Sequence, residues 1–117
     1  GKIMTDCLFC RIINKEIPSK LVYEDEKVLA FEDIKPQAPA HILIIPKKHL
    51  SSLKEADEND QNLLGYLLLT ARKIAEDKGL ADSGFRLVIN SGPDSGQEVY
   101  HLHVHLLGGR PFGWPPG

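Results

Sequence analysis

Three histidines stand at every second position in the stretch "VYHLHVHLLGG": His101, His103 and His105. The chain has only 5 histidines in 117 residues, so three of them within five positions is far above the average frequency of histidine in this chain. On a β-strand, a period of two places all three rings on one face, about 6.6 Å apart along the backbone. Neutral imidazole is a nucleophile and a proton carrier, so one ring can attack a phosphorus or acyl centre while its neighbours orient it and bind charged oxygens.

The alternative is a row of histidines packed on a sheet face with no chemical role. Burying three rings together costs roughly 1–3 kcal/mol for each polar atom left without a partner. We therefore favour the chemical interpretation of the row. The packing interpretation stays open for any one histidine taken alone.

The segment Gly92–Gln97, just before this row, is rich in turn-forming residues. We expect a loop whose backbone N–H groups at Gly92, Ser95 and Gly96 bind a phosphate. The sequence contains neither a GxxxxGK[ST] phosphate loop nor a GxSxG nucleophile elbow. The pattern therefore favours phosphoryl or nucleotidyl transfer through a covalent histidine intermediate.

Cys7 and Cys10 form a CxxC pair and are the only cysteines of the chain. This spacing is typical of half a zinc site. The alternatives are a reduced free pair and a redox dithiol, although no thioredoxin-like βαβ pattern surrounds the pair. So few cysteines in a small chain favour the cytoplasm over secretion.

Length and composition predict one domain over residues 1–117. The formal charge is −2 and the basic residues are scattered, so a nucleic-acid partner is not expected. No apolar run approaches the ~20 residues of a membrane span, and the first residues lack the anatomy of a signal peptide. One hypothesis is that Met4 is the natural start and that residues 1–3 remain from expression.

The apolar pattern predicts the elements that must position these residues. We expect a short helix that ends before Pro18, strands at 21–24, 27–31, 41–46, 85–91 and 99–109, and one long helix from about 55 to 79. Residues 41–46, "HILIIP", are apolar without alternation, which is typical of a central strand covered on both faces. Strands, then one long helix, then strands indicate an α+β fold with an antiparallel sheet.

The long helix carries an apolar stripe at three- and four-residue spacing. The stripe consists of Leu64, Leu67, Leu68, Ala71, Ile74 and Ala75. Residues 57–60, three of which are acidic, are candidates to cap its start, and Gly79 is a candidate to end it. Tyr66 and Leu69 fall outside the stripe, which hints at a partner subunit.

The motif "HLHVHLL" resembles the His-φ-His-φ-His-φ-φ signature of the histidine-triad (HIT) family. The resemblance extends over "EIPSKLVYEDEKVLAFEDIKPQAPAHILIIPKKHL" and "SGQEVYHLHVHLLGGRPFGWPPG", from about Cys7 to Gly117. The "LLGGR" and terminal "WPPG" segments are similar to the Hint branch, the purine nucleoside phosphoramidases. The resemblance implies a five-stranded antiparallel sheet with one long and one short helix, and a homodimer with a ten-stranded sheet.

The implied activity is hydrolysis of the P–N bond of purine nucleoside phosphoramidates. The products are a nucleoside 5′-monophosphate (AMP or GMP) and an amine, formed through a nucleotidyl-histidine intermediate. By match to the family's motif, His103 is the nucleophile, His105 contacts phosphate oxygens and His41 supports the nucleophile's ring. His101 completes the implied catalytic set.

The resemblance also implies a nucleotide site. It assigns Phe9 and Ile34 to the base, Asp33 to the ribose, Asn90, Gly96 and Gln97 to the phosphate side, and Trp114 to the partner's site. Taken singly, most of these residues would be interpreted as core, turn or packing positions. Glu98 departs from animal members, which carry serine there, so we expect its charge to favour cationic amine leaving groups.

Some family members complete the CxxC pair with the histidine of "PKKH" and the first triad histidine. Here the resemblance implies a structural zinc on Cys7, Cys10, His49 and His101. His101 is then a ligand, and only His103 and His105 do chemistry. No catalytic metal is expected, because no acidic cluster is placed to bind magnesium beside the triad.

Two other functions stay open at this point. One is a dinucleoside polyphosphate hydrolase or nucleotidyl transferase of the same family, against which the "GWPPG" ending weighs. The other is a nucleotide-binding interaction protein with residual activity. In each case we expect a cytoplasmic protein without a membrane partner.

Overall fold

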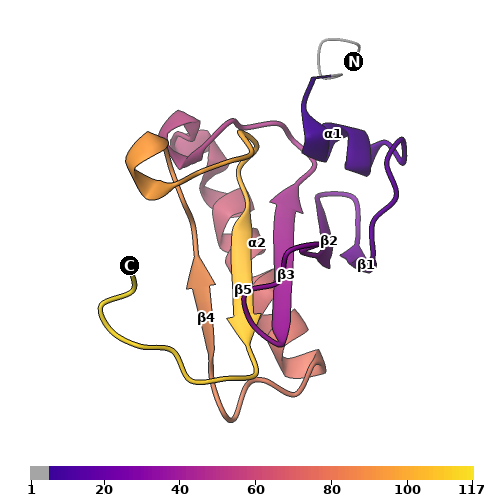
Figure 1. The fold of residues 1–117 in the computed structure, drawn as a ribbon. Helices are drawn as coiled ribbons and strands as arrows, with labels where there is room; N and C mark the ends of the chain where they lie inside the picture. The colour runs from indigo at the N-terminus through magenta and orange to yellow at the C-terminus, as the bar shows by residue number, and fades with distance from the viewer. Residues whose placement is uncertain (1–5) are drawn as a thin grey trace.

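A five-stranded antiparallel sheet forms the centre of the structure, a computed structural model that describes residues 6–117 (Figure 1). The strands are β1 (Leu21–Glu24), β2 (Val28–Glu32), β3 (Ala40–Pro46), β4 (Phe85–Val88) and β5 (Val104–Gly108), in the order β1-β2-β3-β5-β4. Two α-helices, α1 (Leu8–Ile13) and α2 (Gln61–Asp77), accompany the sheet. The predicted α+β fold is confirmed; the hypothesis about residues 1–3 and Met4 lies outside the described residues.

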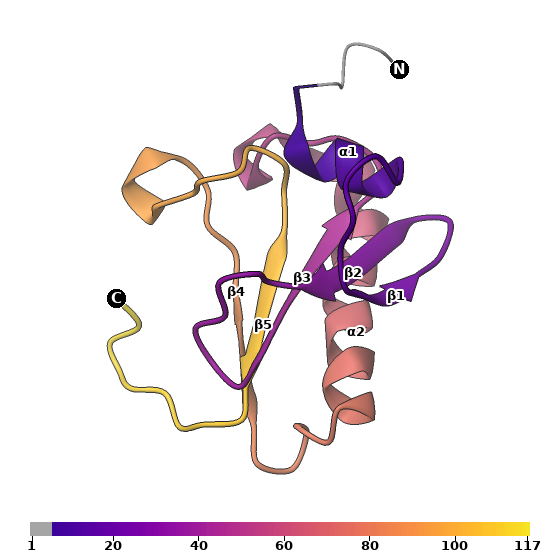
Figure 2. The ribbon, with the colours of Figure 1, turned by 45° about the vertical axis from the view of Figure 1, so that its right-hand side comes forward.

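Strand β3 is the middle strand and is buried on both faces. Ile42 and Ile44 point towards α2, whereas Leu43 and Ile45 point towards α1. This alternation divides the core into two layers, and Figure 2 shows α2 running along one side of the sheet. The prediction of a doubly covered central strand is confirmed, because a strand between two apolar layers needs no polar face.

Helix α2 begins at Gln61 rather than near residue 55. The preceding residues form two short 3₁₀ turns, Leu53–Glu55 and Glu58–Asp60. Asp57 accepts a hydrogen bond from the Asn59 N–H (2.8 Å) and donates its own N–H to the Asp60 carboxylate (3.0 Å). The acidic cluster therefore caps a 3₁₀ turn instead of the α-helix. Gly79, at φ 75°, ends the helix as expected.

The predicted stripe of α2 is correct except at Leu68, which is 44% exposed. Leu63 packs against the core, and Thr70 is buried. Tyr66 is not spare surface, because its hydroxyl donates to the Asp25 carboxylate at the turn between β1 and β2. Among the described residues, no helix is long and apolar enough to cross a bilayer.

Strand β5 begins at Val104, so His101 and His103 precede it, contrary to the prediction of one strand over 99–109. The ladder to β3 ends at the pair Ile44–Val104. Beyond this pair the chain diverges, and the Pro46 carbonyl accepts a hydrogen bond from the His101 ring (2.8 Å) instead of a backbone N–H. Strand β4 likewise ends at Val88 rather than at residue 91.

Candidate functional site

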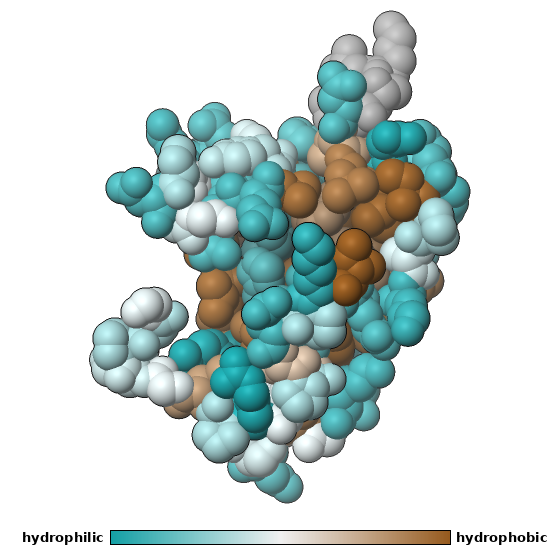
Figure 3. All heavy atoms as spheres, viewed as in Figure 1, coloured by the Kyte–Doolittle hydropathy of each residue, from teal (hydrophilic) through white to brown (hydrophobic). Residues whose placement is uncertain are grey.

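A cavity of about 590 Å³ opens on the α1 side of the sheet. Its volume lies within the range of small-molecule sites. The apolar part of its wall comes from α1, β2, β3 and the neighbouring loops, and Figure 3 shows hydrophobic surface gathered around α1. The predicted site residues that line it are Phe9, Asp33, Ile34, His41, Asn90, Gly96, Glu98, His103 and His105.

Gln97 and Trp114 do not line this cavity. The Gln97 side chain is buried, where it accepts from the Gly92 N–H (2.9 Å) and donates to the carbonyls of Ser51 (2.9 Å) and Val99 (3.1 Å). These hydrogen bonds hold the loop at 92–97 in place. They use the polar atoms of the Gln97 side chain, which is therefore not directed at a phosphate. Trp114 is 84% exposed on the C-terminal tail.

The three loop N–H groups expected to bind a phosphate are already in use. The Gly92 N–H donates to Gln97, the Ser95 N–H to the Gly92 carbonyl (3.3 Å) and the Gly96 N–H to the Pro93 carbonyl (3.0 Å). The loop forms a 3₁₀ turn, Pro93–Ser95, and such a turn consumes its own donors. The expectation of an open backbone cradle was therefore wrong.

The His103 ring is buried, and its orientation is fixed by one hydrogen bond. Its Nδ1–H donates to the His101 carbonyl (2.7 Å), since a carbonyl can only accept. The neutral ring therefore carries its lone pair on Nε2. Burial lowers the pKa of His103, which favours this neutral form.

His41 and His105 form a second pair of rings, one step along the sheet. The Gln37 backbone N–H donates to His41 Nδ1 (3.0 Å), so the proton of neutral His41 is on Nε2. That Nε2–H faces His105 Nδ1 at 2.9 Å, which in turn places the proton of His105 on Nε2. Burial lowers the pKa of His105 to about 4. Asp33 lies beside this pair, with Oδ2 3.5 Å from His41 Nε2.

Proximity alone would also allow Asp33, His41 and His105 to bind a metal, because their donor atoms lie within 4.8 Å of one another. The Gln37 contact argues against that use. A metal needs a lone pair on His41 Nε2, and the N–H on the opposite side of the ring places a proton there. The arrangement fixes the tautomers of the two rings rather than offering them to a metal.

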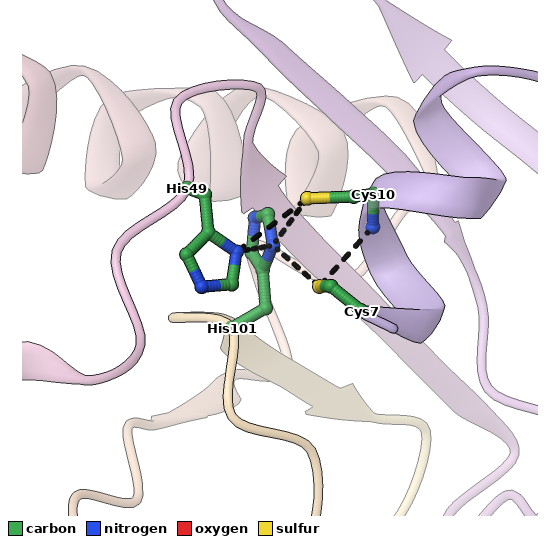
Figure 4. A group of neighbouring side chains, drawn as sticks. All are labelled: Cys7, Cys10, His49 and His101. Atoms are coloured by element: carbon green, nitrogen blue, oxygen red, sulfur yellow. Dashed lines mark hydrogen bonds between the residues drawn. The ribbon is translucent and has the colours of Figure 1, made fainter. Parts of the chain in front are cut away.

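Cys7, Cys10, His49 and His101 meet at the start of α1 (Figure 4). His101 Nδ1 lies 3.3 Å from Cys7 Sγ, 3.6 Å from Cys10 Sγ and 3.1 Å from His49 Nδ1. A tetrahedral zinc site with ordinary bond lengths spaces sulfur and nitrogen ligands about 3.6 Å apart and two nitrogens about 3.3 Å apart. The four donors thus fit a structural zinc, as predicted.

The surroundings of the cluster suit a metal. His101 Nε2–H donates to the Pro46 carbonyl, which turns the Nδ1 lone pair towards the two sulfurs. The Cys10 N–H donates to Cys7 Sγ (3.3 Å) at the start of the helix. Burial, aided by the neighbouring Cys7, raises the pKa of Cys10 to about 12, so this thiol ionises only beside a cation such as zinc.

Gln37 contributes to the site and was missed from the sequence. Its contribution is a backbone N–H, which every residue except proline has. No residue type or spacing in "KPQAPA" signals this contact. Only the packing of the loop against β3 brings the N–H onto the His41 ring.

The comparisons with known proteins agree with this geometry. A family model described as "HIT domain" matches residues 14–112. An uncharacterized HIT-like protein from Synechocystis sp. is 57% identical over 112 residues, covering 96% of this chain and 97% of that protein. A 14 kDa zinc-binding protein from Zea mays is 61% identical over 112 residues, covering 94% and 87%. The crystal structure of a HIT family hydrolase from Legionella pneumophila superposes with a TM-score of 0.94 at 53% identity, covering 95% and 99%.

Proposed function

Because this chain belongs to the HIT domain family, we propose that it is a nucleoside phosphoramidase of the Hint branch. The proposed reaction is hydrolysis of the P–N bond of purine nucleoside phosphoramidates. One observation carries the proposal: the bond from His103 Nδ1–H to the His101 carbonyl leaves a lone pair on Nε2, and His103 lines a cavity of about 590 Å³. The similarity to a HIT family hydrolase supports hydrolysis as the reaction class.

In the first step, the lone pair of His103 Nε2 attacks phosphorus. The P–N bond to the leaving group breaks, and the nitrogen takes up a proton from solvent to leave as the amine. The ring becomes an imidazolium in the nucleotidyl intermediate, and its remaining N–H still donates to the His101 carbonyl. That bond lets the ring accept positive charge without losing a partner.

In the second step, a water molecule attacks phosphorus from the side opposite the ring. The bond between phosphorus and His103 Nε2 breaks, the electron pair returns to the ring, and the water proton goes to solvent. The nucleoside 5′-monophosphate is released. His105 Nε2–H donates to a phosphate oxygen in both steps, and His41 fixes the His105 tautomer.

The nucleotide is proposed to occupy the rest of the cavity. Phe9 and Ile34 contact a purine base, as in AMP or GMP, and Asp33 accepts hydrogen bonds from the ribose hydroxyls. Asn90 and Gly96 lie on the phosphate side. The zinc cluster contributes structure rather than chemistry, since His101 uses both ring nitrogens away from the cavity.

The proposal extends to the oligomeric state, the location and the partners of the protein. The chain acts as one domain and as a homodimer, in which Trp114 reaches the partner's cavity. The proposed location is the cytoplasm. Its partners are small nucleotides rather than nucleic acids or membranes.

The test is steady-state turnover of an adenosine phosphoramidate by the wild-type protein and by His103→Ala. Loss of the nucleophile should reduce kcat by about 10⁴-fold or more. Rapid quenching followed by peptide mass spectrometry should locate a nucleotidyl adduct on the peptide that contains His103. Faster turnover of a dinucleoside polyphosphate would reassign the substrate, and nucleotide binding without turnover would identify an interaction protein.

A further inference from the structure

Arg110, in the "LLGGR" segment, does not line the cavity, yet all three of its guanidinium nitrogens donate to backbone oxygens. Nε and Nη2 donate to the Gln37 carbonyl at 3.3 and 3.0 Å, and Nη1 donates to the Pro111 carbonyl at 3.0 Å. Its guanidinium carbon lies 4.3 Å from the centre of the Phe112 ring. Arg110 is exposed, yet its three hydrogen bonds and its contact with the Phe112 ring give the guanidinium a defined position.

Gly109 explains how Arg110 reaches Gln37. Its φ of 91° is in the left-handed region that favours glycine. A Cβ at this position would lie 2.8 Å from Pro39 Cβ, closer than two carbons can approach. The chain therefore turns tightly against the loop between β2 and β3 at the end of β5 and carries Arg110 across that loop.

Gln37 connects Arg110 to the rings of His41 and His105. We call the hydrogen bonds from Arg110 to the Gln37 carbonyl the Arg110 clamp. The Gln37 carbonyl is held by Arg110, and the Gln37 N–H donates to His41 Nδ1. The loop also carries internal bonds, from the Asp33 N–H to the His41 carbonyl (2.9 Å) and from the Gln37 side chain to the Lys35 carbonyl (3.1 Å). Arg110 adds hydrogen bonds from outside the loop. They reach Gln37, the residue whose N–H fixes the His41 tautomer.

We infer that Arg110 is a positioning residue for the proposed phosphoramidase reaction. By holding the Gln37 carbonyl, it keeps the Gln37 N–H on His41 Nδ1 and thereby keeps the Nε2–H of His105 directed at the substrate phosphate. When the clamp is lost, His41 is free to carry its proton on Nδ1. Its Nε2 then accepts from His105, whose proton moves to Nδ1, and the donor to the phosphate disappears.

The inference rests on the proposed function for its substrate, but the tautomers belong to the free protein. The experiment therefore has two readouts on Arg110→Ala: imidazole nitrogen NMR shifts of His41 and His105, and kcat with an adenosine phosphoramidate. We expect a new Nδ1–H population on both rings and a fall in kcat of about 10- to 100-fold, with a smaller change in KM. Arg110→Lys, which lacks the planar fork, should fall between wild type and alanine.

Arg86→Ala is the matched control. The Arg86 guanidinium carbon also lies 5.2 Å from the centre of the Phe112 ring, and its Nη2 donates to the Gly113 carbonyl in the tail (2.9 Å) rather than to Gln37. This variant should keep wild-type tautomers and a wild-type kcat, and any effect that it has through the tail should appear in KM. Melting temperatures check that each variant is folded.

Wild-type tautomers in Arg110→Ala would overturn the inference, as would an equal loss of kcat in Arg86→Ala, which would assign the effect to the tail. If the wild-type protein does not hydrolyse the phosphoramidate, the proposed function fails. The tautomer readout still decides the positioning role in that case.

Discussion

At the scale of single residues, the chemistry of this site depends on which nitrogen of each ring carries the proton. A backbone carbonyl fixes His103, and another fixes His101. A backbone N–H fixes His41, which then fixes His105. Three of the four rings are oriented directly by the main chain, whose hydrogen-bonding groups stay the same in every substitution except one to proline. The site is therefore sensitive to backbone position more than to the identity of neighbouring side chains.

The buried rings make the fold sensitive to acid between pH 6.5 and 4. Burial lowers the pKa of His105 from 6.5 to about 4 and also lowers that of His41. The unfolded chain binds protons on these rings near pH 6.5, whereas the folded chain resists them, so stability is present above pH 6.5 and is lost as the pH falls. The melting temperature should decline across this window, and less steeply in His105→Gln, which cannot be protonated there.

A paired carboxylate acts in a different window. The Lys48 ammonium lowers the pKa of Asp60 from 3.8. The stability that this ion pair contributes is therefore lost only as the pH falls below about 3.8, outside the window of the histidines. Parallel melting curves of wild type and His105→Gln between pH 7 and 4 would contradict the role given to His105.

Glu98 is an exposed residue that lines the cavity, where its charge can select the leaving group. We expect the wild-type protein to favour cationic over neutral amine leaving groups by up to about fivefold, the scale of an exposed ion pair. Glu98→Ser should lose this preference. Asp94→Ser is the control, because Asp94 is exposed on the same loop but does not line the cavity. The measurement is kcat/KM for matched phosphoramidates, and identical ratios in wild type and Glu98→Ser would remove the hypothesis.

At the scale of elements, we expect the zinc cluster to stabilise α1 in addition to the burial of Phe9 and Ile12. Helix α1 has 6 residues, too short to be stable alone, and Cys7 and Cys10 connect it to His49 and His101. Protein purified without chelator should contain one zinc per chain, and chelation should lower the melting temperature by roughly 4 °C or more. Cys7→Ser should show the lower value from the start and respond little to chelator. Metal-free protein whose melting point does not change with chelator would contradict this assignment.

The elements also show where sequence reasoning works. The run of β3 predicts its central place, because burial on both faces leaves a purely local signature. The first residues of α2 and of β5 carry no such local sequence signature. The three acids within 57–60 suit an α-helix and a 3₁₀ turn equally. Near the start of β5, the His101 ring and the Leu102 N–H donate to the carbonyls of the distant residues Pro46 and Leu50.

The candidate site divides in the same way. The types and spacing of the triad and the CxxC pair indicate the chemistry and the metal cluster. The use of Gln97 as a brace and the bonded N–H groups of the loop could not be predicted, because they depend on contacts such as that with Ser51. Long-range hydrogen bonds of the main chain leave no residue pattern to detect.

At the scale of the whole molecule, the sheet ends in two edge strands, β1 and β4. Strand β4 carries Arg86, which binds the tail at Gly113, and Figure 1 shows the tail passing on the β4 side. Pairing of two β4 edges would continue the sheet to ten strands and bring the exposed Trp114 towards the partner. We expect light scattering to give twice the 13.0 kDa of one chain.

Trp114→Ala should keep the dimer mass and raise KM for the nucleotide, since the residue is proposed to act on the partner's cavity. A mass of one chain at micromolar concentration would contradict the dimer. An unchanged KM in Trp114→Ala would contradict the role of the tail.

In a strand that is apolar on both faces, His41 is the residue that opposes a shift in register. If β3 paired with its neighbours one residue out of step, Ile42 and Ile44 would exchange layers with Leu43 and Ile45 at little hydrophobic cost. The same slip would place the His41 imidazole in the apolar layer between the sheet and α2, where burying a polar ring without a hydrogen-bond partner costs about 1–3 kcal/mol. The polar ring of His41 therefore favours the native register, in which the Gln37 N–H and His105 are its hydrogen-bond partners.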